Sequence, residues 1–445
     1  MLLIGNGILI TWNASMPYLE DGAVVFDGNS ILDFGSTGEM RKKYDGAESY
    51  DARGRLIMPG LINAHTHIYS SFARGLSMPQ PGPNKDFLDI LENIWWRIDK
   101  VLNEQDNLYS AYATGLESVR YGVTTLFDHH ASQYNVEGSL FAIEKALSHI
   151  GLRASLCYEV SDRDGKDTAK KAINENINFI DYSVKKDSDL IRGMLGLHAS
   201  FTLSPETLEQ CVEAIGSRNA GFHVHCAEGI GDLYDSLNKY GKRVVERLHD
   251  AKILGEKTLA IHNIHINDAE MDILKATNTM TVHNPESNMG NAVGCTPALH
   301  MLKKGILLGL GTDAYTQDMF ESLKAANIIH KHHQCNSNIG FTESIDMLFK
   351  NNAAICQRFW EKPLGIIKPG AYADIIVVDY IPHTPLNENN IYGHIMFGLM
   401  GRCVDSTIIN GRFIMKDRVM QTVDEQEILA KSREQSADFW KRVCK

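Results

Sequence analysis

Eight short apolar runs, separated by longer segments of helical periodicity, occupy residues 59–361 of this 445-residue chain. Each run is rich in aliphatic and β-branched residues, which predicts a strand followed by a helix. A (β/α)8 barrel consists of eight strand–helix units in series, so we expect an α/β fold of the TIM-barrel type. The predicted strands are LINAHTH, GVTTLFDHH, LRASLCYE, IRGMLGLHAS, GFHVHCAE, TLAIHN, TMTVHNP and ILLGLGTDA.

The two ends of the chain follow a different pattern. Residues 1–58 and 362–425 consist of short β-rich runs punctuated by Gly, Asn and Asp, which predicts one small discontinuous β domain built from both ends. Residues 426–445 have helical periodicity, and the segment runs from an acidic start to a basic end, as suits a helix dipole. A length of 445 residues also favours two domains over one.

The composition narrows the expected partners. The chain has 44 basic and 55 acidic residues, and this net charge of -11 argues against nucleic acid or an anionic membrane and leaves small-molecule chemistry open. Its eight cysteines form no CxxC pair, which is typical of reduced thiols in a cytosolic protein. The N-terminus lacks the basic leader of a signal peptide, and no apolar run is long enough for a membrane span. We therefore expect a cytoplasmic protein.

Nearly every predicted strand ends in His, Asp or Glu. In a parallel barrel the C-terminal strand ends meet at one face, so residues far apart in the sequence are expected to share one pocket. A single strand-end histidine is more often a hydrogen-bonded core residue than a ligand, but the same kind of ending on strand after strand is hard to attribute to chance. These residues are His65 with His67, Asp128 with His129, Glu159, His198, His225, His262, His283 and Asp313.

The dipeptide spacing of His65 and His67 is the most specific local signal. Residues i and i+2 of a strand point to the same face, so both imidazoles can bind one cation. The expected distance is about 2.0–2.1 Å if the ion is zinc.

The motifs PGLINAHTH, HVHCAE, AIHN, HNPESN and GTDA resemble those of the amidohydrolase superfamily, in its deaminase and chlorohydrolase branch. The resemblance extends over residues 1–425, because the β-rich ends are similar to the composite β-sandwich domain of that branch. More narrowly, FARGLSMPQPGPNKDFLDILENIWWRIDKVL and FDHHAS resemble the SsnA-type aminohydrolases. Many members of the superfamily form homodimers or larger homo-oligomers, and the sequence shows no interface signal of its own.

The resemblance implies one divalent metal ion held by four side chains. Three neutral imidazoles and one carboxylate suit Zn²⁺, the ion we expect, and also Fe²⁺. The run RGMLGLHAS has no lysine where binuclear relatives place a bridging lysine, which favours a single ion. The implied ligands are His65, His67, His225 and Asp313.

The spacing His-x-x-Glu of this branch selects His225 and Glu228 within HVHCAE. We interpret His223 as a packed residue of the barrel core. For Glu228 the alternative to a functional role is a solvated loop carboxylate.

The resemblance also implies catalytic roles. Asp313 accepts a proton from water, and Glu228 as general acid protonates a ring nitrogen and then the departing ammonia. His262 polarises the nucleophile or stabilises the tetrahedral adduct. His198 occupies the position where relatives place a substrate-binding histidine, although LHAS departs from their Pro-His-Ala-Pro.

For several further residues the sequence allows either a structural role or a role at the site. His129 and His130 can contact the substrate or make structural hydrogen bonds, and His283 can orient neighbouring groups. Trp95 and Trp96 lie in a helical pattern, which favours helix packing over stacking on the substrate. The prolines of the same loop, Pro79, Pro81 and Pro83, are expected to stiffen it.

The leading hypothesis is a hydrolytic deaminase of an amino-substituted nitrogen heterocycle or an amidine-like compound. The alternative enzyme removes halide or another leaving group from a similar ring, and the acid Glu228 favours deamination because it can protonate the ring and ammonia. A non-catalytic assembly protein on the same scaffold predicts missing ligands, whereas all four are present.

Overall fold

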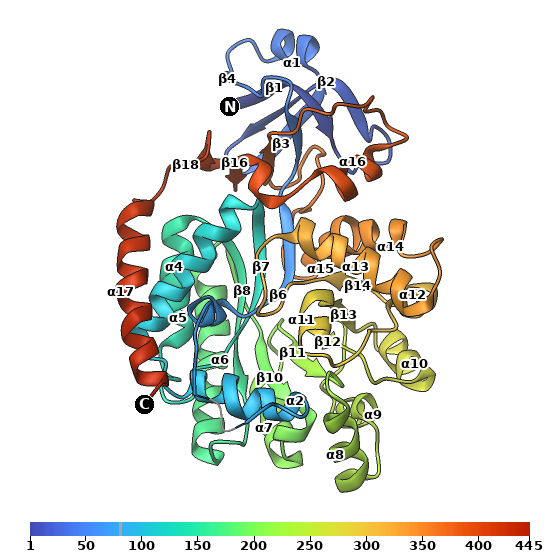
Figure 1. Ribbon diagram of the computed structural model, residues 1–445. Helices are drawn as coiled ribbons and strands as arrows, with labels where there is room; N and C mark the ends of the chain where they lie inside the picture. The colour runs from blue at the N-terminus through green and yellow to red at the C-terminus, as the bar shows by residue number, and fades with distance from the viewer. Residues whose placement is uncertain (80–81) are drawn as a thin grey trace.

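The computed structural model describes residues 1–79 and 82–445. Within these ranges the chain forms two sheets, one from the middle of the sequence and one from its two ends (Figure 1). Pro81, one of the prolines expected to stiffen the long loop, lies outside the described residues. No helix of the described ranges combines the length and the apolar character needed to cross a membrane.

The central sheet is parallel, and its strands follow one another in chain order, β6-β7-β8-β10-β11-β12-β13-β14. This order confirms the predicted (β/α)8 barrel. The fourth predicted strand is split, and its first part, β9, pairs with β8. The strands are β6 (Leu61–Thr66), β7 (Val123–His130), β8 (Arg153–Val160), β9 (Ile191–Gly193), β10 (Leu195–Ala199), β11 (Phe222–Cys226), β12 (Leu259–His262), β13 (Met280–His283) and β14 (Leu308–Leu310).

The barrel closes through the residues that end its first and last strands. Thr66 and Asp313 form a parallel bridge, and the backbone N–H groups of Thr312 and Asp313 both donate to the His65 carbonyl oxygen over 3.0 Å. The seam of the barrel therefore lies beside His65 and Asp313, and it fixes the distance between two predicted metal ligands.

Helices surround the barrel strands, and several begin where their capping residues predict. Asn103 forms a capping box with Asp106, and Ser204 caps a helix that has Pro205 at its first position. The barrel helices are α4 (Glu104–Arg120), α5 (Ser139–Ile150), α6 (Lys166–Lys186), α7 (Pro205–Ile215), α8 (Ile230–Tyr240), α9 (Val244–Asp250), α10 (Asp268–Ala276), α11 (Pro285–Gly290), α12 (Ala298–Lys303), α13 (Met319–Gln334), α14 (Phe341–Ile345) and α15 (Asn352–Cys356), with a 3₁₀ turn η3 (Ser200–Thr202) and a π-helical turn η4 (Asp346–Asn351).

The long connection after β6 contains the tryptophan pair. The sequence predicts one helix here, whereas the structure has a π-helical turn, η2 (Leu91–Trp95), between the short helices α2 (Phe87–Ile90) and α3 (Trp96–Asp99). Such turns are frequent at functional sites. A 3₁₀ turn, η1 (Ile68–Ala73), precedes them.

The second sheet joins both ends of the chain, as predicted for the small β domain. Strand β5 links its two halves, because it pairs in parallel with β1 and antiparallel with β15. The strands are β1 (Leu2–Ile10), β2 (Tyr18–Asp27), β3 (Ser30–Ser36), β4 (Glu48–Asp51), β5 (Leu56–Pro59), β15 (Ile375–Val378), β16 (Val404–Ile409), β17 (Arg412–Lys416) and β18 (Val419–Met420).

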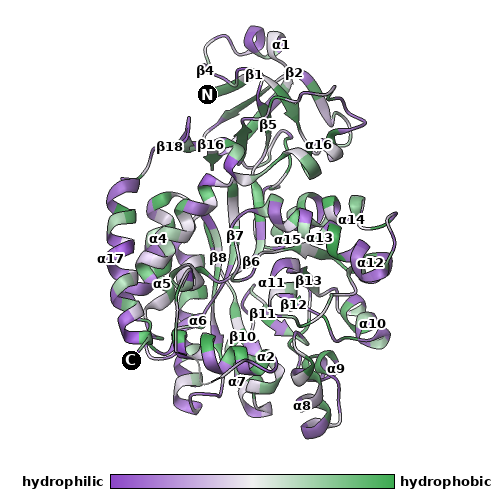
Figure 2. Cartoon of the chain, viewed as in Figure 1, coloured by the Kyte–Doolittle hydropathy of each residue, from purple (hydrophilic) through white to green (hydrophobic). Residues whose placement is uncertain are grey.

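The remaining helices lie outside the two sheets. These are α1 (Thr37–Lys43), α16 (Ile391–Gly398), the 3₁₀ turn η5 (Gly401–Cys403) and α17 (Glu425–Val443). Helix α17 lies along α4, and its Trp440 indole donates to the Phe72 carbonyl oxygen over 2.7 Å (Figure 1). Figure 2 shows hydrophobic residues concentrated on the strands, whereas α17 is largely hydrophilic.

A buried ion pair connects the barrel to the end-derived sheet. The Arg153 guanidinium on β8 donates to both carboxylate oxygens of Asp374, over 3.0 and 3.1 Å, and both side chains are buried. The same guanidinium lies 4.3 Å from the Tyr372 ring centroid. This pair therefore couples the two sheets.

Replacing Arg153 with Met is expected to lower the free energy of unfolding by about 3–5 kcal/mol, because the buried Asp374 carboxylate loses its counter-charge. Urea denaturation measures the change. Arg218→Met is the matched control: its pair with Asp181 is largely exposed, so its loss should cost only about 0–1 kcal/mol. Equal effects of the two substitutions would contradict the coupling.

Candidate active site

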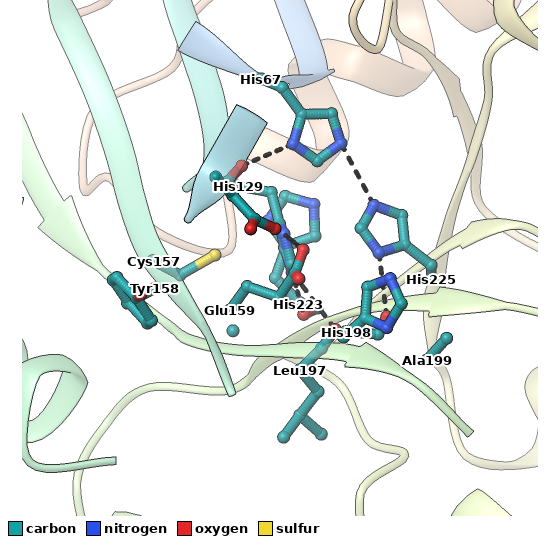
Figure 3. Close-up of polar contacts among 12 residues, drawn as sticks. His67, His129, Cys157, Tyr158, Glu159, Leu197, His198, Ala199, His223 and His225 are labelled. Atoms are coloured by element: carbon teal, nitrogen blue, oxygen red, sulfur yellow. Dashed lines mark hydrogen bonds and ion pairs between the residues drawn. The ribbon is translucent and has the colours of Figure 1, made fainter. Parts of the chain in front are cut away.

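Two imidazoles face each other where β6 and β11 end (Figure 3). His67 Nδ1 lies 2.6 Å from the His129 carbonyl oxygen, and His225 Nδ1 lies 2.9 Å from the His198 carbonyl oxygen. Because a carbonyl only accepts, both Nδ1 atoms donate, and the Nε2 atoms of the neutral rings present lone pairs. These two Nε2 atoms are 3.3 Å apart.

The separation of the two Nε2 atoms fits a shared cation. Facing lone pairs repel unless a proton or a metal ion lies between them. Two nitrogens bound to one tetrahedral Zn²⁺ at about 2.0–2.1 Å stand about 3.3–3.4 Å apart. The donor set and its spacing therefore fit a metal centre.

Asp313, which follows β14, brings a carboxylate to this pair. Its Oδ1 lies 3.1 Å from His67 Nε2 and 3.6 Å from His65 Nε2. Among the described residues, the buried His65 Nε2 has no hydrogen-bond partner, so it is free to bind a cation. His65 Nδ1 lies 2.9 Å from His223 Nε2. His223 is buried as expected, and it also orients the His65 ring.

The backbone of Asp313 is strained, and neighbouring hydrogen bonds hold it in place. Its φ of +56° lies in the left-handed region, which costs a non-glycine residue about 1–3 kcal/mol. The Thr66 hydroxyl donates to the Asp313 carbonyl oxygen, and the barrel seam holds its N–H. Surrounding hydrogen bonds thus keep the carboxylate turned toward the imidazoles.

The ligand atoms of the described residues come within 4.8 Å of one another in overlapping groups of three. These groups bring all four predicted ligands to one place, together with His129, Glu228 and His262. The groups are His65–His67–Asp313, His67–His129–His225, His65–His225–His262 and Glu228–His262–Asp313.

The charges at the site also suit a cation. Burial would raise the pKa of Asp313, but the close contacts of its carboxylate with the His65 and His67 imidazoles outweigh it and hold that pKa well below its usual value. Burial and the neighbouring imidazoles of His129 and His65 lower the pKa of His225 well below the usual value. The cluster therefore combines a carboxylate with an imidazole held neutral.

Glu228 and His262 lie on the other side of Asp313. His262 Nε2 lies 3.4 Å from Glu228 Oε2 and 3.7 Å from Asp313 Oδ2. The Glu228 side chain is only 11% exposed, which argues against a solvated loop carboxylate. Burial and the negative charge of Asp313 raise the pKa of Glu228 well above its usual value, so the environment favours the protonated acid.

The other strand-end histidines differ in their contacts. His198 lines the cavity, and its Nδ1 lies 2.7 Å from Thr202 Oγ1. His129 Nε2 points at two backbone carbonyl oxygens over 3.1 and 3.2 Å, and His130 Nε2 lies 2.9 Å from Ser132 Oγ. These contacts fit the structural interpretation of His129 and His130.

The cavity above these groups encloses about 550 Å³ including its open mouth. Its wall includes residues that strand ends do not reveal. Arg163 pairs with Asp99 and, over 2.9 Å, with Glu159. Asp99 and Arg163 lie outside the strands, where no periodic pattern marks them. Only the tertiary structure brings this buried ionic cluster to the cavity.

The tryptophan pair also lines the cavity, and Trp95 packs in addition against the cluster that contains Tyr69 and Phe72. The position of the pair is compatible with both interpretations. The Trp96 ring centroid lies 6.1 Å from that of His198, and the Arg163 guanidinium lies 5.2 Å from the Trp96 centroid. The π-helical turn η2 rotates the end of the helical segment, which places both neighbouring indoles at the cavity.

The barrel and its cluster of strand-end imidazoles define a hydrolase of the metal-dependent barrel type. The chain belongs to the amidohydrolase family, whose model matches residues 56–414. This membership confirms the resemblance of the sequence motifs to that superfamily.

Individual relatives match over nearly the whole chain. The 5-methylthioadenosine/S-adenosylhomocysteine deaminase of Thermococcus sibiricus is 31% identical over 93% of this chain and 94% of its own. The zinc-bound adenosine deaminase of Xanthomonas campestris superimposes with a TM-score of 0.86 at 21% identity, covering 99% of this chain and 98% of that one. The zinc-complexed atrazine chlorohydrolase of Arthrobacter aurescens gives 0.82 at 22% identity, covering 98% and 100%.

Proposed function

We propose that the protein is a hydrolytic deaminase of an amino-substituted nitrogen heterocycle or a similar amidine, dependent on one Zn²⁺ per chain. The observation that carries this proposal is the pair of facing Nε2 lone pairs of His67 and His225, 3.3 Å apart beside the Asp313 carboxylate. His65, whose buried Nε2 has no hydrogen-bond partner within residues 1–79 and 82–445, completes the proposed ligand set.

A metal ion bound by these four residues would supply Lewis-acid chemistry, lowering the pKa of water to near 7 and polarising the substrate. The two carboxylate oxygens of Asp313 face different neighbours, so one can bind the metal while the other accepts a proton. Oδ1 faces the imidazoles of His65 and His67, whereas Oδ2 faces His262 and accepts a hydrogen bond from Ser287. In this proposal Oδ2 takes the proton of the attacking water.

Glu228 transfers protons to the substrate. As the water oxygen adds to the amino-bearing carbon, the Glu228 carboxyl donates its proton to the adjacent ring nitrogen. The Glu228 carboxylate then takes the proton of the adduct hydroxyl and passes it to the amino group, and ammonia leaves as the C–N bond breaks. The proton held by Asp313 finally returns to Glu228. His262, 3.4 Å from Glu228 Oε2, contacts the same reacting atoms, and His198 binds the ring from the cavity wall.

The names of the relatives support the choice of ring chemistry. The Thermococcus and Xanthomonas proteins are named for deaminating adenosine-type compounds, and we propose an aminated purine or related ring as the substrate class. The Arthrobacter protein is named an atrazine chlorohydrolase, so dechlorination is the competing function. The raised pKa of Glu228 favours deamination, because ammonia needs a proton to depart whereas chloride does not.

A screen of ammonia release tests the function. Zinc-loaded protein is expected to release ammonia from at least one member of a panel of purines, nucleosides, pyrimidines, pterins and guanidino compounds, and from none after chelation of the metal. Halide release from chlorinated rings is measured in parallel. Halide release without ammonia release would replace the deaminase proposal with the competing function.

A further inference from the structure

Asn288 and Thr296 surround the His262 imidazole on the side away from the cavity. Asn288 lies on α11, Thr296 follows that helix, and both side chains are buried. Neither lines the cavity that contains Glu228 and Asp313. Their contacts therefore act on His262 and not on a bound substrate.

The hydrogen bonds of Thr296 Oγ1 determine its donor and acceptor roles. It donates its single proton to the His262 carbonyl oxygen over 2.8 Å. Its two lone pairs then accept from Asn288 Nδ2 and from His283 Nδ1, each over 3.1 Å. The hydroxyl is saturated, which also accounts for a buried contact of His283.

This saturation fixes the orientation of the Asn288 amide. The atom that faces Thr296 must be the NH₂ group, so the amide oxygen faces His262 Nδ1, at 2.8 Å. Asn288 Nδ2 and His283 Nδ1 both donate to the same hydroxyl, so their own 3.5 Å separation is a contact and not a hydrogen bond. An amide oxygen only accepts, and His262 Nδ1 must therefore carry the proton.

The backbone of His262 is strained and is also held by Thr296. Its φ of +70° lies in the left-handed region, as does the +53° of Asn263. A strained histidine persists only where its surroundings hold it. The Thr296 hydroxyl donates to the His262 carbonyl oxygen, and it also orients the Asn288 amide that accepts from the His262 ring. One hydroxyl therefore fixes both the backbone and the side chain of His262.

We infer that Asn288 and Thr296 are positioning residues that lock His262 in its Nδ1–H tautomer, with the Nε2 lone pair facing Glu228 and Asp313. The inference rests on the proposed function for the role of His262. It separates the two roles that the sequence leaves open. A neutral ring of this tautomer accepts a hydrogen bond from the attacking water, and it cannot donate one to the tetrahedral adduct before it gains a proton.

Nuclear magnetic resonance of the zinc-loaded protein, labelled with ¹⁵N-histidine, tests the tautomer without a substrate. The His262 signals are assigned by their loss in His262→Gln. The expected wild-type spectrum has a protonated, pyrrole-type Nδ1 and an unprotonated Nε2. A proton on Nε2 in the wild-type protein overturns the inference, whether or not the deaminase assay succeeds.

Three variants test the positioning residues. Asn288→Asp keeps an accepting oxygen and is expected to keep the Nδ1–H tautomer, whereas Asn288→Leu removes it and should shift the proton equilibrium toward Nε2. Thr296→Val leaves the amide in place but frees its orientation, so it should also populate the second tautomer. The exposed Asn338→Leu serves as the control with a wild-type spectrum.

The rate gives a second readout. On a substrate found in the screen, Asn288→Leu is expected to lower kcat by about 10–100-fold, with partial recovery in Asn288→Asp and with the metal content unchanged. If Thr296→Val and Asn288→Leu both keep the wild-type tautomer, the inference is overturned. Should Asn288→Leu fail to fold, the wild-type and Thr296→Val spectra decide it.

Discussion

Replacing Glu228 with Gln is expected to lower kcat by about 10²–10⁴-fold, the usual contribution of a general acid. The amide has nearly the shape of the carboxyl group, but it cannot deliver a proton to a ring nitrogen or to ammonia. Glu228 lies 3.4 Å from His262 and is not among the proposed ligands. The metal content should therefore stay unchanged, and the loss should fall on kcat.

The measurement is the initial rate of ammonia release, with zinc quantified in the same preparation. Glu427→Gln is the matched control, because Glu427 is exposed on α17. Wild-type turnover in Glu228→Gln would show that another group supplies the proton. Loss of zinc together with activity would instead make Glu228 a ligand and overturn its assignment as the acid.

Replacing His67 with Ala is expected to remove the metal. His67 Nε2 lies 3.3 Å from His225 Nε2 and 3.1 Å from Asp313 Oδ1, so the substitution takes the central donor from the proposed set. It also leaves Asp313 without one of the imidazole contacts that hold its pKa down. We expect zinc to fall from about one ion per chain to a small fraction of that, with activity lost in proportion.

Metal analysis after dialysis measures this change. His300→Ala is the control, since its imidazole is half exposed and pairs with Asp268 at the surface. An unchanged zinc content in His67→Ala would contradict the ligand set. Two ions per wild-type chain would contradict the single-metal proposal while leaving the four ligands in place.

Local sequence patterns were sufficient for the barrel and for much of its site. The apolar runs predicted the barrel strands, because a buried parallel strand needs a continuous apolar segment. The i, i+2 spacing of His65 and His67 predicted that both point to one face, and strand direction predicted that His225 and Asp313 meet them. These inferences depend only on the two-residue alternation of side chains along a strand and on the direction of the strands.

Other features depend on contacts between distant segments. The split of the fourth strand and the π-helical turn before Trp96 have no local signature in the sequence. Asp99 and Arg163 are 64 residues apart, and they reach the cavity only because helix α3 meets the loop after β8. The sequence therefore missed the ionic cluster in the cavity wall.

What the sequence alone determined is which side chains end the barrel strands, since the strand period and the parallel topology fix that face. Only the tertiary structure decided the state of each side chain: the His129 and His198 carbonyls turn two Nε2 lone pairs toward each other, and Asn288 and Thr296 turn that of His262. A tautomer is set by a hydrogen-bond partner about 3 Å away in space. Such a partner can lie anywhere in the chain, so no local pattern encodes it.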